Sequence, residues 1–412
     1  MPAEDLRLLI AGHLHLDGVL RGIPENEAVH SIVRDANMRA FERLVELAME
    51  HPVDAVIITG SLFEGVPSVR AASLFRDGMA ALAEEQIATV LASQSSQQIN
   101  LLADCECLPE SVQILSNDHP SLQIETRHAP RNPFHACLMD RVSSRSAQLP
   151  QVDLGIVNSG WLEPQHEENS HRNMACRLRV FNGAETFHSA QKPEGLWLAP
   201  GSIQALNGSY PGDRSVTICH LSATGEISYT NHSTSSVCYV EVDYPLNPAE
   251  EANKLQRGLF DLIEQSIPSA EQRAELYCFQ WKMRGPIAAL KTWNRAALKS
   301  ILDRFHFTQE TETQICHQLQ WTLQLSGQGV SSNQIDVSED VEEDLLRCLT
   351  EVGMTESRQS PTSAISALLN GKTGWDQAAI EELKQQIDWK QVCHRAAELG
   401  MTAWLNADTP AA

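Results

Sequence analysis

Short apolar runs alternate with amphipathic stretches in the N-terminal part of the chain. Leu6–Ala11 holds a single polar residue, Arg7, which predicts a strand buried on both faces. Two further apolar runs follow, each preceded by apolar residues at helical spacing. The predicted strands are 6–11, 53–58 and 88–91, and the predicted helices are 37–50 and 69–85. This order predicts a β-α-β-α-β unit with parallel strands over residues 1 to about 100.

The pattern changes twice further along the chain. Short β-like runs are predicted at 112–115, 122–124, 153–157, 195–199, 215–221, 226–230 and 237–244. From about residue 245, helices at 248–265 and 288–305 alternate with strands at 275–284 and 316–325, which indicates a small βαβ-type module. An acidic linker and apolar stripes at helical spacing follow. The predicted domains are therefore 1–244, 245–326 and 327–412.

Composition narrows the class of protein. The 412 residues leave room for two or three domains, and a hydrophobic content of 42% supports real cores. No apolar run reaches the roughly 18 residues of a membrane span, and the N-terminus does not resemble a signal peptide. The ten cysteines are scattered and form no CxxC, which predicts reduced, buried thiols and a cytoplasmic protein.

The formal net charge of −22 argues against diffuse attraction to nucleic acid. The net charge does not exclude a local basic groove that binds nucleic acid, because arginines cluster in two stretches. These are Arg127, Arg131, Arg141 and Arg145, then Arg172, Arg177 and Arg179. The alternative is that both clusters are ordinary solvated loop charges.

Polar side chains follow each of the first three predicted strands. The first strand leads into His13, His15 and Asp17, and the second leads into Ser61 and Glu64. The third leads into the polar segment 93–96, which holds Gln94 and Ser95. The carboxyl ends of parallel strands meet at one edge of a sheet, where α/β proteins bind ligands. We therefore expect these loops to form one site.

The predicted strands, helices and polar loops, in this order, resemble those of the calcineurin-like metallophosphoesterases over roughly residues 6–325. More narrowly, they resemble those of the SbcD-type DNA repair exonucleases. The family's Asp-x-His-x-x-Asp, Gly-Asp-Leu-Phe-Asp, Gly-Asn-His-Asp and Pro-Gly-Ser-x-Gln segments are matched by 13–17, 60–64, 93–96 and 200–204. The resemblance implies a four-layer α/β sandwich, a small α/β capping domain and a helical C-terminal tail.

The reactive residues differ from those of the family. Its members hold two divalent metals bridged by a carboxylate, and these metals activate water for attack on a phosphodiester. Here the neutral Ser61 stands at the bridging position, and His13 replaces the first aspartate. Gln94, Ser95, Asn158 and Thr186 replace an asparagine and three histidines, while His188 keeps the last histidine. The two-metal centre is therefore predicted to be dismantled, as in a pseudoenzyme.

Two interpretations of the remaining histidines stay open. His13, His15 and His188 could form a three-histidine site for zinc or manganese, because imidazoles at alternate positions of an extended segment share a face. The alternative is that they are hydrogen-bonded residues of a vestigial pocket, with Asp17 as a supporting group and no metal or other cofactor. A serine nucleophile at Ser93, Ser95 or Ser96 lacks a recognisable base.

The sequence thus predicts a degenerate SbcD-like homologue that binds or scaffolds DNA ends without cutting them. One alternative is an active metal-dependent phosphodiesterase or exonuclease with atypical ligands. Another is a protein-interaction module that does not bind nucleic acid. The resemblance implies an SbcC-like coiled-coil ATPase partner, bound through the C-terminal helices, and pairing of two copies as a homodimer. Packing of those helices onto the chain's own body is the alternative, and no membrane association is expected.

Overall fold

The computed structural model describes residues 5–23, 27–92, 108–127, 133–139, 152–158, 176–193, 195–247, 249–267, 274–285, 289, 292–293, 295–305, 307–310 and 315–327. The chain divides into two compact units. One comprises Met1–Glu241, Leu262–Gln280 and Phe305–Thr322, and the other comprises Val242–Asp261, Trp281–Arg304 and Leu323–Ala412. The three-domain division of the sequence analysis remains a prediction.

The first sheet contains the strands that the N-terminal pattern predicts. Its order is β12-β11-β1-β2-β3-β4. The strands are β1 (Leu6–Ala11), β2 (Ala55–Thr59), β3 (Ala88–Ala92), β4 (Val112–Ile114), β11 (Ser215–Leu221) and β12 (Ile227–Ser233). The neighbours β1, β2, β3 and β4 pair in parallel, as predicted. β11 pairs antiparallel with β1 and with β12.

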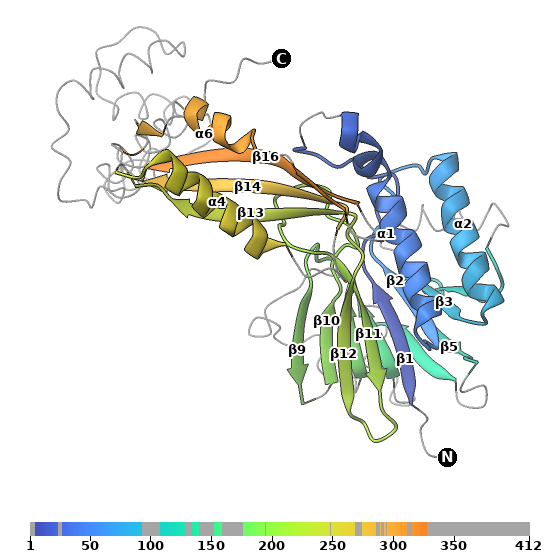
Figure 1. The fold of residues 1–412 in the computed structure, drawn as a ribbon. Helices are drawn as coiled ribbons and strands as arrows, with labels where there is room; N and C mark the ends of the chain where they lie inside the picture. Colours follow the sequence, from blue (N-terminus) through green and yellow to red (C-terminus); the bar gives the residue numbers. More distant parts are fainter. Residues whose placement is uncertain are drawn as a thin grey trace, which may run out of the picture. The chain divides into compact units, whose positions relative to one another are not determined.

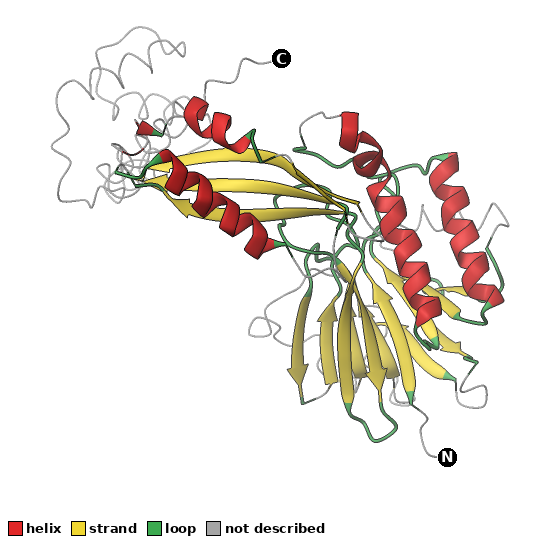
Figure 2. Ribbon diagram, viewed as in Figure 1, coloured by secondary structure: helices red, strands yellow, loops and turns green. Residues whose placement is uncertain are grey.

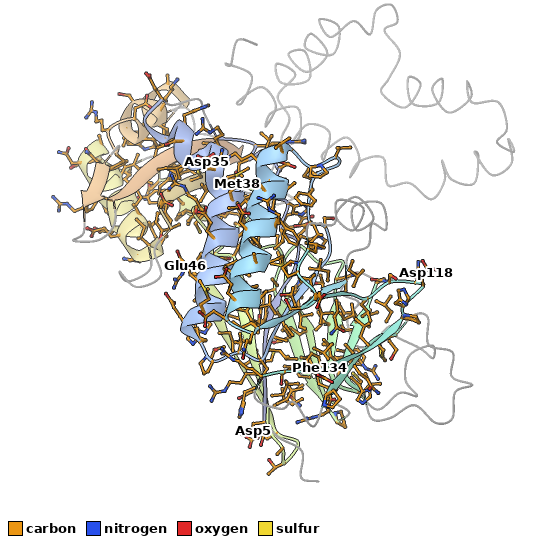
Figure 3. All side chains as sticks on the ribbon, turned by 90° about the vertical axis from the view of Figure 1, so that its right-hand side faces the viewer. Asp5, Asp35, Met38, Glu46, Asp118 and Phe134 are labelled. Atoms are coloured by element: carbon orange, nitrogen blue, oxygen red, sulfur yellow. The ribbon has the colours of Figure 1, made fainter. Side chains whose placement is uncertain are left out.

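Two helices cover one face of this sheet, α1 (His30–Glu50) and α2 (Val69–Glu84) (Figure 1). Phe41 of α1 stacks on Phe75 of α2 with ring centroids 5.6 Å apart, and both rings belong to the core beneath the helices. Figure 3 shows the side chains along α1, with Asp35, Met38 and Glu46 labelled.

The start of α1 differs from the prediction of a helix from residue 37. A 3-10 turn, η1 (Glu27–Val29), leads directly into α1 at His30. The first turns of α1 bury Ile32 and Ala36 in a separate core cluster. Ile32 and Ala36 precede Ala40 at the four-residue spacing of one helix face, so they continue the apolar stripe, and the predicted start at residue 37 was too late.

The second sheet has the order β5-β6-β7-β8-β10-β9. Its strands are β5 (Ser121–Ile124), β6 (Phe134–Leu138), β7 (Val152–Val157), β8 (Cys176–Phe181), β9 (His188–Lys192) and β10 (Gly195–Ala199). Its apolar side chains form a common core with those of the first sheet, which includes Leu8, Ile57, Ile156 and Val180. The two sheets therefore pack face to face, and with α1 and α2 they form three layers: helices, sheet and sheet (Figure 2).

The sequence did not reveal β6, β8 and β9. In β8 the residues Arg177 and Arg179 interrupt the apolar pattern, and both were assigned to a basic cluster or a solvated loop. That assignment is wrong for Arg179, which is 2% exposed and lies over the Trp197 ring at 5.2 Å. The guanidinium plane can stack on an aromatic ring, so the arginine serves as a core residue here.

A third sheet has the order β13-β14-β16-β15. Its strands are β13 (Val237–Pro245), β14 (Leu276–Gly285), β15 (Phe307–Glu310) and β16 (Ile315–Gly327), and the helices of this part of the chain are α4 (Ala252–Ser266) and α6 (Arg295–Leu302). The predicted helices and strands of this region are present, and β13 and β15 add to the predicted module. Trp281 of β14 is fully buried.

The described chain is thus a mixed α/β protein with sheets flanked by helices. Five cysteines are buried and free, in agreement with the thiol prediction for these residues: Cys137, Cys176, Cys219, Cys238 and Cys278. Among the described residues, no helix has the length and apolar character needed to cross a membrane.

Candidate functional site

The loops after β1 and β2 lie side by side at the carboxyl ends of these strands. The amide of Leu14 donates to the Ser61 carbonyl at 2.9 Å, and the amide of Leu16 donates to the Leu62 carbonyl at 3.0 Å. The amide of Ser61 in turn donates to Nδ1 of His13 at 3.1 Å. The first two predicted loops therefore meet, while the third, 93–96, lies outside the described residues.

The segment 200–204, which follows the carboxyl end of β10, packs against the loop after β1. The amide of Ile203 donates to the His13 carbonyl at 3.1 Å, and the amide of Ser202 donates to the Glu185 carbonyl at 3.1 Å. A Cβ on Gly12 would lie 1.8 Å from the Gly201 carbonyl oxygen, so only a glycine allows this approach. This packing holds Glu185 beside the turn that follows β1.

His13 and His15 form a stacked pair at the centre of the site. Their ring centroids lie 5.2 Å apart with an interplanar angle of 9°, and the residues are only 7% and 5% exposed. The predicted reason for their proximity is wrong, because His15 has a φ of 45° rather than an extended backbone. Asn37 of α1 fixes the turn by donating to the carbonyls of His15 at 2.6 Å and Gly18 at 2.7 Å.

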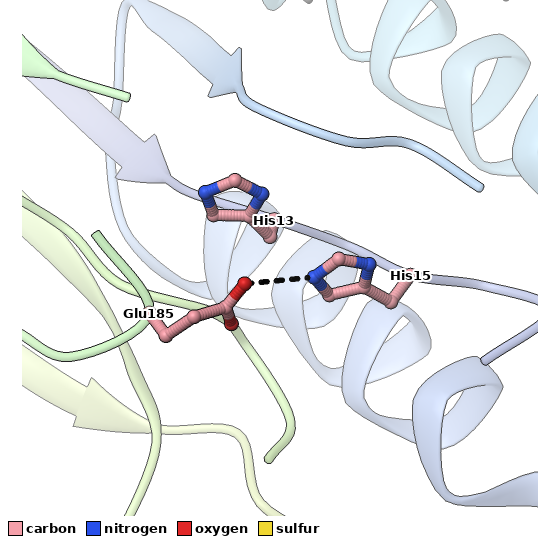
Figure 4. A group of neighbouring side chains, drawn as sticks. All are labelled: His13, His15 and Glu185. Carbon is pink, nitrogen blue, oxygen red and sulfur yellow. Dashed lines mark hydrogen bonds and ion pairs between the residues drawn. The ribbon is translucent and has the colours of Figure 1, made fainter. Parts of the chain in front are cut away.

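Two carboxylates flank His15, although the sequence indicated no clearly placed carboxylate ligand. Glu64 Oε1 lies 2.6 Å from Nδ1 of His15. Glu185 Oε1 lies 3.4 Å from Nε2 of His15, as Figure 4 shows. Three possible metal-ligand atoms, one from each of His13, His15 and Glu185, lie within 4.8 Å of one another. His188 is not part of this group. Its ring hydrogen-bonds to the Thr186 hydroxyl at 2.8 Å, and its side chain is exposed.

The surroundings of the site lower the pKa values of both His13 and Glu185. Burial lowers the pKa of His13, and the nearby His15 acts in the same direction, whereas Glu185 and Glu64 oppose the shift. Burial alone would raise the pKa of Glu185, but the hydrogen bond with His15 and the charges of both histidines outweigh it and lower that pKa. His13 therefore favours the neutral form, and Glu185 favours the carboxylate.

Asp17 has a structural role at the start of α2. Its carboxylate accepts hydrogen bonds from the amide of Ser68 at 2.8 Å and from the Ser68 hydroxyl at 2.6 Å. Ser68 is the N-cap residue of α2, and its hydroxyl accepts a bond from the amide of Ala71 at 3.2 Å. Asp17 thus ties the loop after β1 to α2, and its role as a supporting group of the histidines stays a prediction.

The remaining site residues from the sequence analysis are Asn158, Gln94 and Ser95. Asn158 accepts a hydrogen bond from the Asn182 amide group at 2.5 Å. Gln94 and Ser95 are outside the described residues, as are Ser93 and Ser96. Sequence reasoning missed Glu185, although it adjoins Thr186 in the segment 182–188 that was matched to the family's histidine motif.

No protein-family model and no curated protein matches the sequence. Among solved structures, vacuolar protein sorting 29 from Cryptosporidium parvum is 12% identical, with a TM-score of 0.27 over 56% of this chain and 100% of its own. A protein of Thermotoga maritima solved by NMR is 15% identical, with a TM-score of 0.23 over 55% of this chain and 99% of its own. A hypothetical protein from Pyrococcus horikoshii OT3 is 12% identical, with a TM-score of 0.26 over 65% of this chain and 95% of its own. TM-scores this low carry no conclusion about the family or function of this chain.

Proposed function

We propose that this chain is a non-catalytic relative of the SbcD-type exonucleases and acts as a binding or scaffolding subunit in DNA-end repair. The proposal includes the calcineurin-like four-layer sandwich and the capping domain. One observation carries it: Ser61, at the position of the bridging carboxylate, offers only a neutral hydroxyl, and its amide is hydrogen-bonded to Nδ1 of His13.

The donor set does not fit the two-metal centre that the resemblance implies. A bridging ligand must present anionic oxygen to both ions, and a neutral serine hydroxyl does not. The nearby carboxylate of Asp17 is engaged with Ser68, and the Asn158 side chain is engaged with Asn182. We therefore derive no catalytic step through a metal pair.

The described members of the two arginine clusters, Arg127, Arg177 and Arg179, do not support a basic DNA groove. Arg127 donates to the carbonyl of Glu85 at 3.0 Å. Arg177 lies 3.6 Å from a carboxylate oxygen of Asp153 and also donates to a backbone carbonyl. Arg179 is buried against Trp197. Each of these cations is thus used within the fold. The SbcC-like partner, the homodimer and the role of the C-terminal helices remain parts of the proposal, and the tail from 328 onward lies outside the described residues.

A second candidate function is a metal-dependent phosphodiesterase with atypical ligands. The observation that favours it is the group of His13, His15 and Glu185, because two imidazoles and a carboxylate are the ligand types of several catalytic zinc sites. In that case zinc or manganese would be the cofactor.

Cleavage of linear duplex and single-stranded DNA, measured with Mn²⁺ or Zn²⁺, tests the proposal. The control is the His13→Ala/His15→Ala double variant prepared in the same way. We expect wild type to cleave no faster than the double variant, because the two-metal centre is lost. Cleavage by wild type that disappears in the double variant would overturn the non-catalytic role and support the phosphodiesterase. Anisotropy of a labelled duplex end, recorded on the same sample, separates DNA binding from a role in protein contacts alone.

A further inference from the structure

A pocket of about 250 Å³ lies at the amino ends of β1 and β2, at the opposite end of these strands from the histidine cluster. Three neighbouring strands of the first sheet, β1, β11 and β12, contribute side chains to its lining (Figure 1). The segment 51–53, between α1 and β2, contributes the rest. The pocket therefore belongs to a single compact unit and shares no residue with the site at the carboxyl ends.

The strand register places three polar side chains in one row inside this pocket. Arg7 of β1 pairs with His220 of β11, and His220 pairs with Ser228 of β12. Residues directly opposite one another on neighbouring strands have Cβ atoms about 4.5–5.5 Å apart and share a face of the sheet. A guanidinium, an imidazole and a hydroxyl therefore lie side by side across three strands. His51, which follows α1, adds a second imidazole to the lining.

The guanidinium of Arg7 faces this pocket without a partner. The hydrogen bond between Arg7 and Asp54 uses the backbone amide, and the guanidinium makes no ion pair or hydrogen bond with the described residues. No aspartate or glutamate of the described chain lines the pocket, although the protein has a formal net charge of −22. An unpaired cation and several donors without a built-in anion favour an anionic ligand.

Two carboxylates lie next to lining residues, and both are engaged elsewhere. Asp5 accepts from the amide of Ala223 at 2.8 Å, and its second oxygen lies 3.4 Å from Nε2 of His220. Glu50 lies 3.1 Å from a guanidinium nitrogen of Arg43. Asp5 thus positions the His220 ring, and the charge of Glu50 is compensated by Arg43. Neither carboxylate takes the place of a ligand at Arg7.

We propose that this pocket binds a phosphate group, either as inorganic phosphate or as the end of a small phosphate monoester. The oxygens of a tetrahedral anion point in several directions, which matches donors that come from three strands and from the segment after α1. A planar carboxylate offers only two oxygens in one plane. Arg7 takes two phosphate oxygens in a bidentate pair, as its planar guanidinium favours. The volume is below the roughly 300–1,000 Å³ of pockets for drug-sized ligands, which favours a small anion.

Phosphorus NMR of the full chain, titrated with inorganic phosphate and separately with phenyl phosphate, tests the site and distinguishes the two forms of the ligand. Arg7→Met keeps the unbranched stem and removes the charge and the donors, so it is expected to weaken binding by about 10-fold or more. Arg34→Met is the matched control, because Arg34 is an exposed arginine of α1 outside the pocket, and it is expected to bind as wild type.

His51→Leu removes one imidazole from the lining and is expected to weaken binding by about 2–10-fold, the loss of one ordinary hydrogen bond. His119→Leu is its matched control, because His119 is exposed and lies outside the pocket. Circular dichroism of each variant separates a lost ligand contact from a lost fold. The exposed side chain of Arg7 makes folding of Arg7→Met the expected result.

The result that supports the site is phosphate binding by wild type that weakens in folded Arg7→Met and not in Arg34→Met. Tighter binding of phenyl phosphate than of inorganic phosphate would identify the monoester as the ligand, and the reverse order would identify the free anion. Absence of binding in wild type, or equal affinity in wild type and folded Arg7→Met, would overturn the site. Acetate that competes as well as inorganic phosphate would overturn the assignment to a phosphate group.

Discussion

Gly12→Ala is expected to lower the free energy of unfolding by about 3 kcal/mol or more, the upper end of what overpacking costs. The added Cβ would lie 1.8 Å from the carbonyl oxygen of Gly201 and 2.8 Å from its carbonyl carbon. Both atoms belong to backbone, so neither can move aside as a flexible side chain would. The turn after β1 and the segment 200–204 must separate, and His13 and Glu185 should move apart with them.

Urea unfolding of wild type and Gly12→Ala measures this loss. Gly225→Ala is the matched control, because Gly225 has a φ of +93° and open space around its Cβ position. The control therefore reports only backbone strain, for which we expect about 1–2 kcal/mol. Equal losses in the two variants would contradict the close approach of the two backbones at Gly12.

Gln204→Met is expected to cost about 3 kcal/mol or more, because it leaves three buried backbone groups without this partner at roughly 1–3 kcal/mol for each group. Gln204 is 1% exposed. Its Oε1 accepts from the amides of Ser236 at 2.9 Å and Val237 at 3.2 Å, and its Nε2 donates to the Val237 carbonyl at 2.7 Å. Methionine fills a similar volume but makes none of these bonds.

The same unfolding measurement applies to Gln204→Met, with Gln191→Met as its control. Gln191 lies on β9 and is exposed, so the same substitution there is expected to change the free energy of unfolding by no more than about 0.5 kcal/mol. A Gln204→Met protein as stable as wild type would show that the bonds to Ser236 and Val237 do not hold the start of β13 in place.

The apolar pattern was sufficient to predict the strands of the N-terminal unit, because a strand buried on both faces needs a continuous apolar run. β1 begins at Leu6 and β3 begins at Ala88, the first residues of the predicted strands. β8 shows where this reasoning fails. The pattern cannot distinguish a solvated arginine from one buried against an aromatic ring, and Arg179 is of the second kind.

The site was predictable in part for a related reason. His13, His15 and Ser61 follow adjacent parallel strands, so the topology alone places them at one edge of the sheet. Glu185 is 170 positions from His15, and its approach depends on the packing of the segment 200–204 against the first loop. The left-handed turn at His15 also had no signal in the sequence, because Asn37 fixes it from α1.

The number of Mn²⁺ ions bound per chain tests the central claim, the loss of the two-metal centre, most directly. Native mass spectrometry of the full chain at saturating Mn²⁺ gives this number, with the His13→Ala/His15→Ala double variant as the reference for non-specific adducts. We expect no more than one ion above the reference, since Ser61 offers no anionic bridge between two ions. Two ions that are both lost in the double variant would contradict the account.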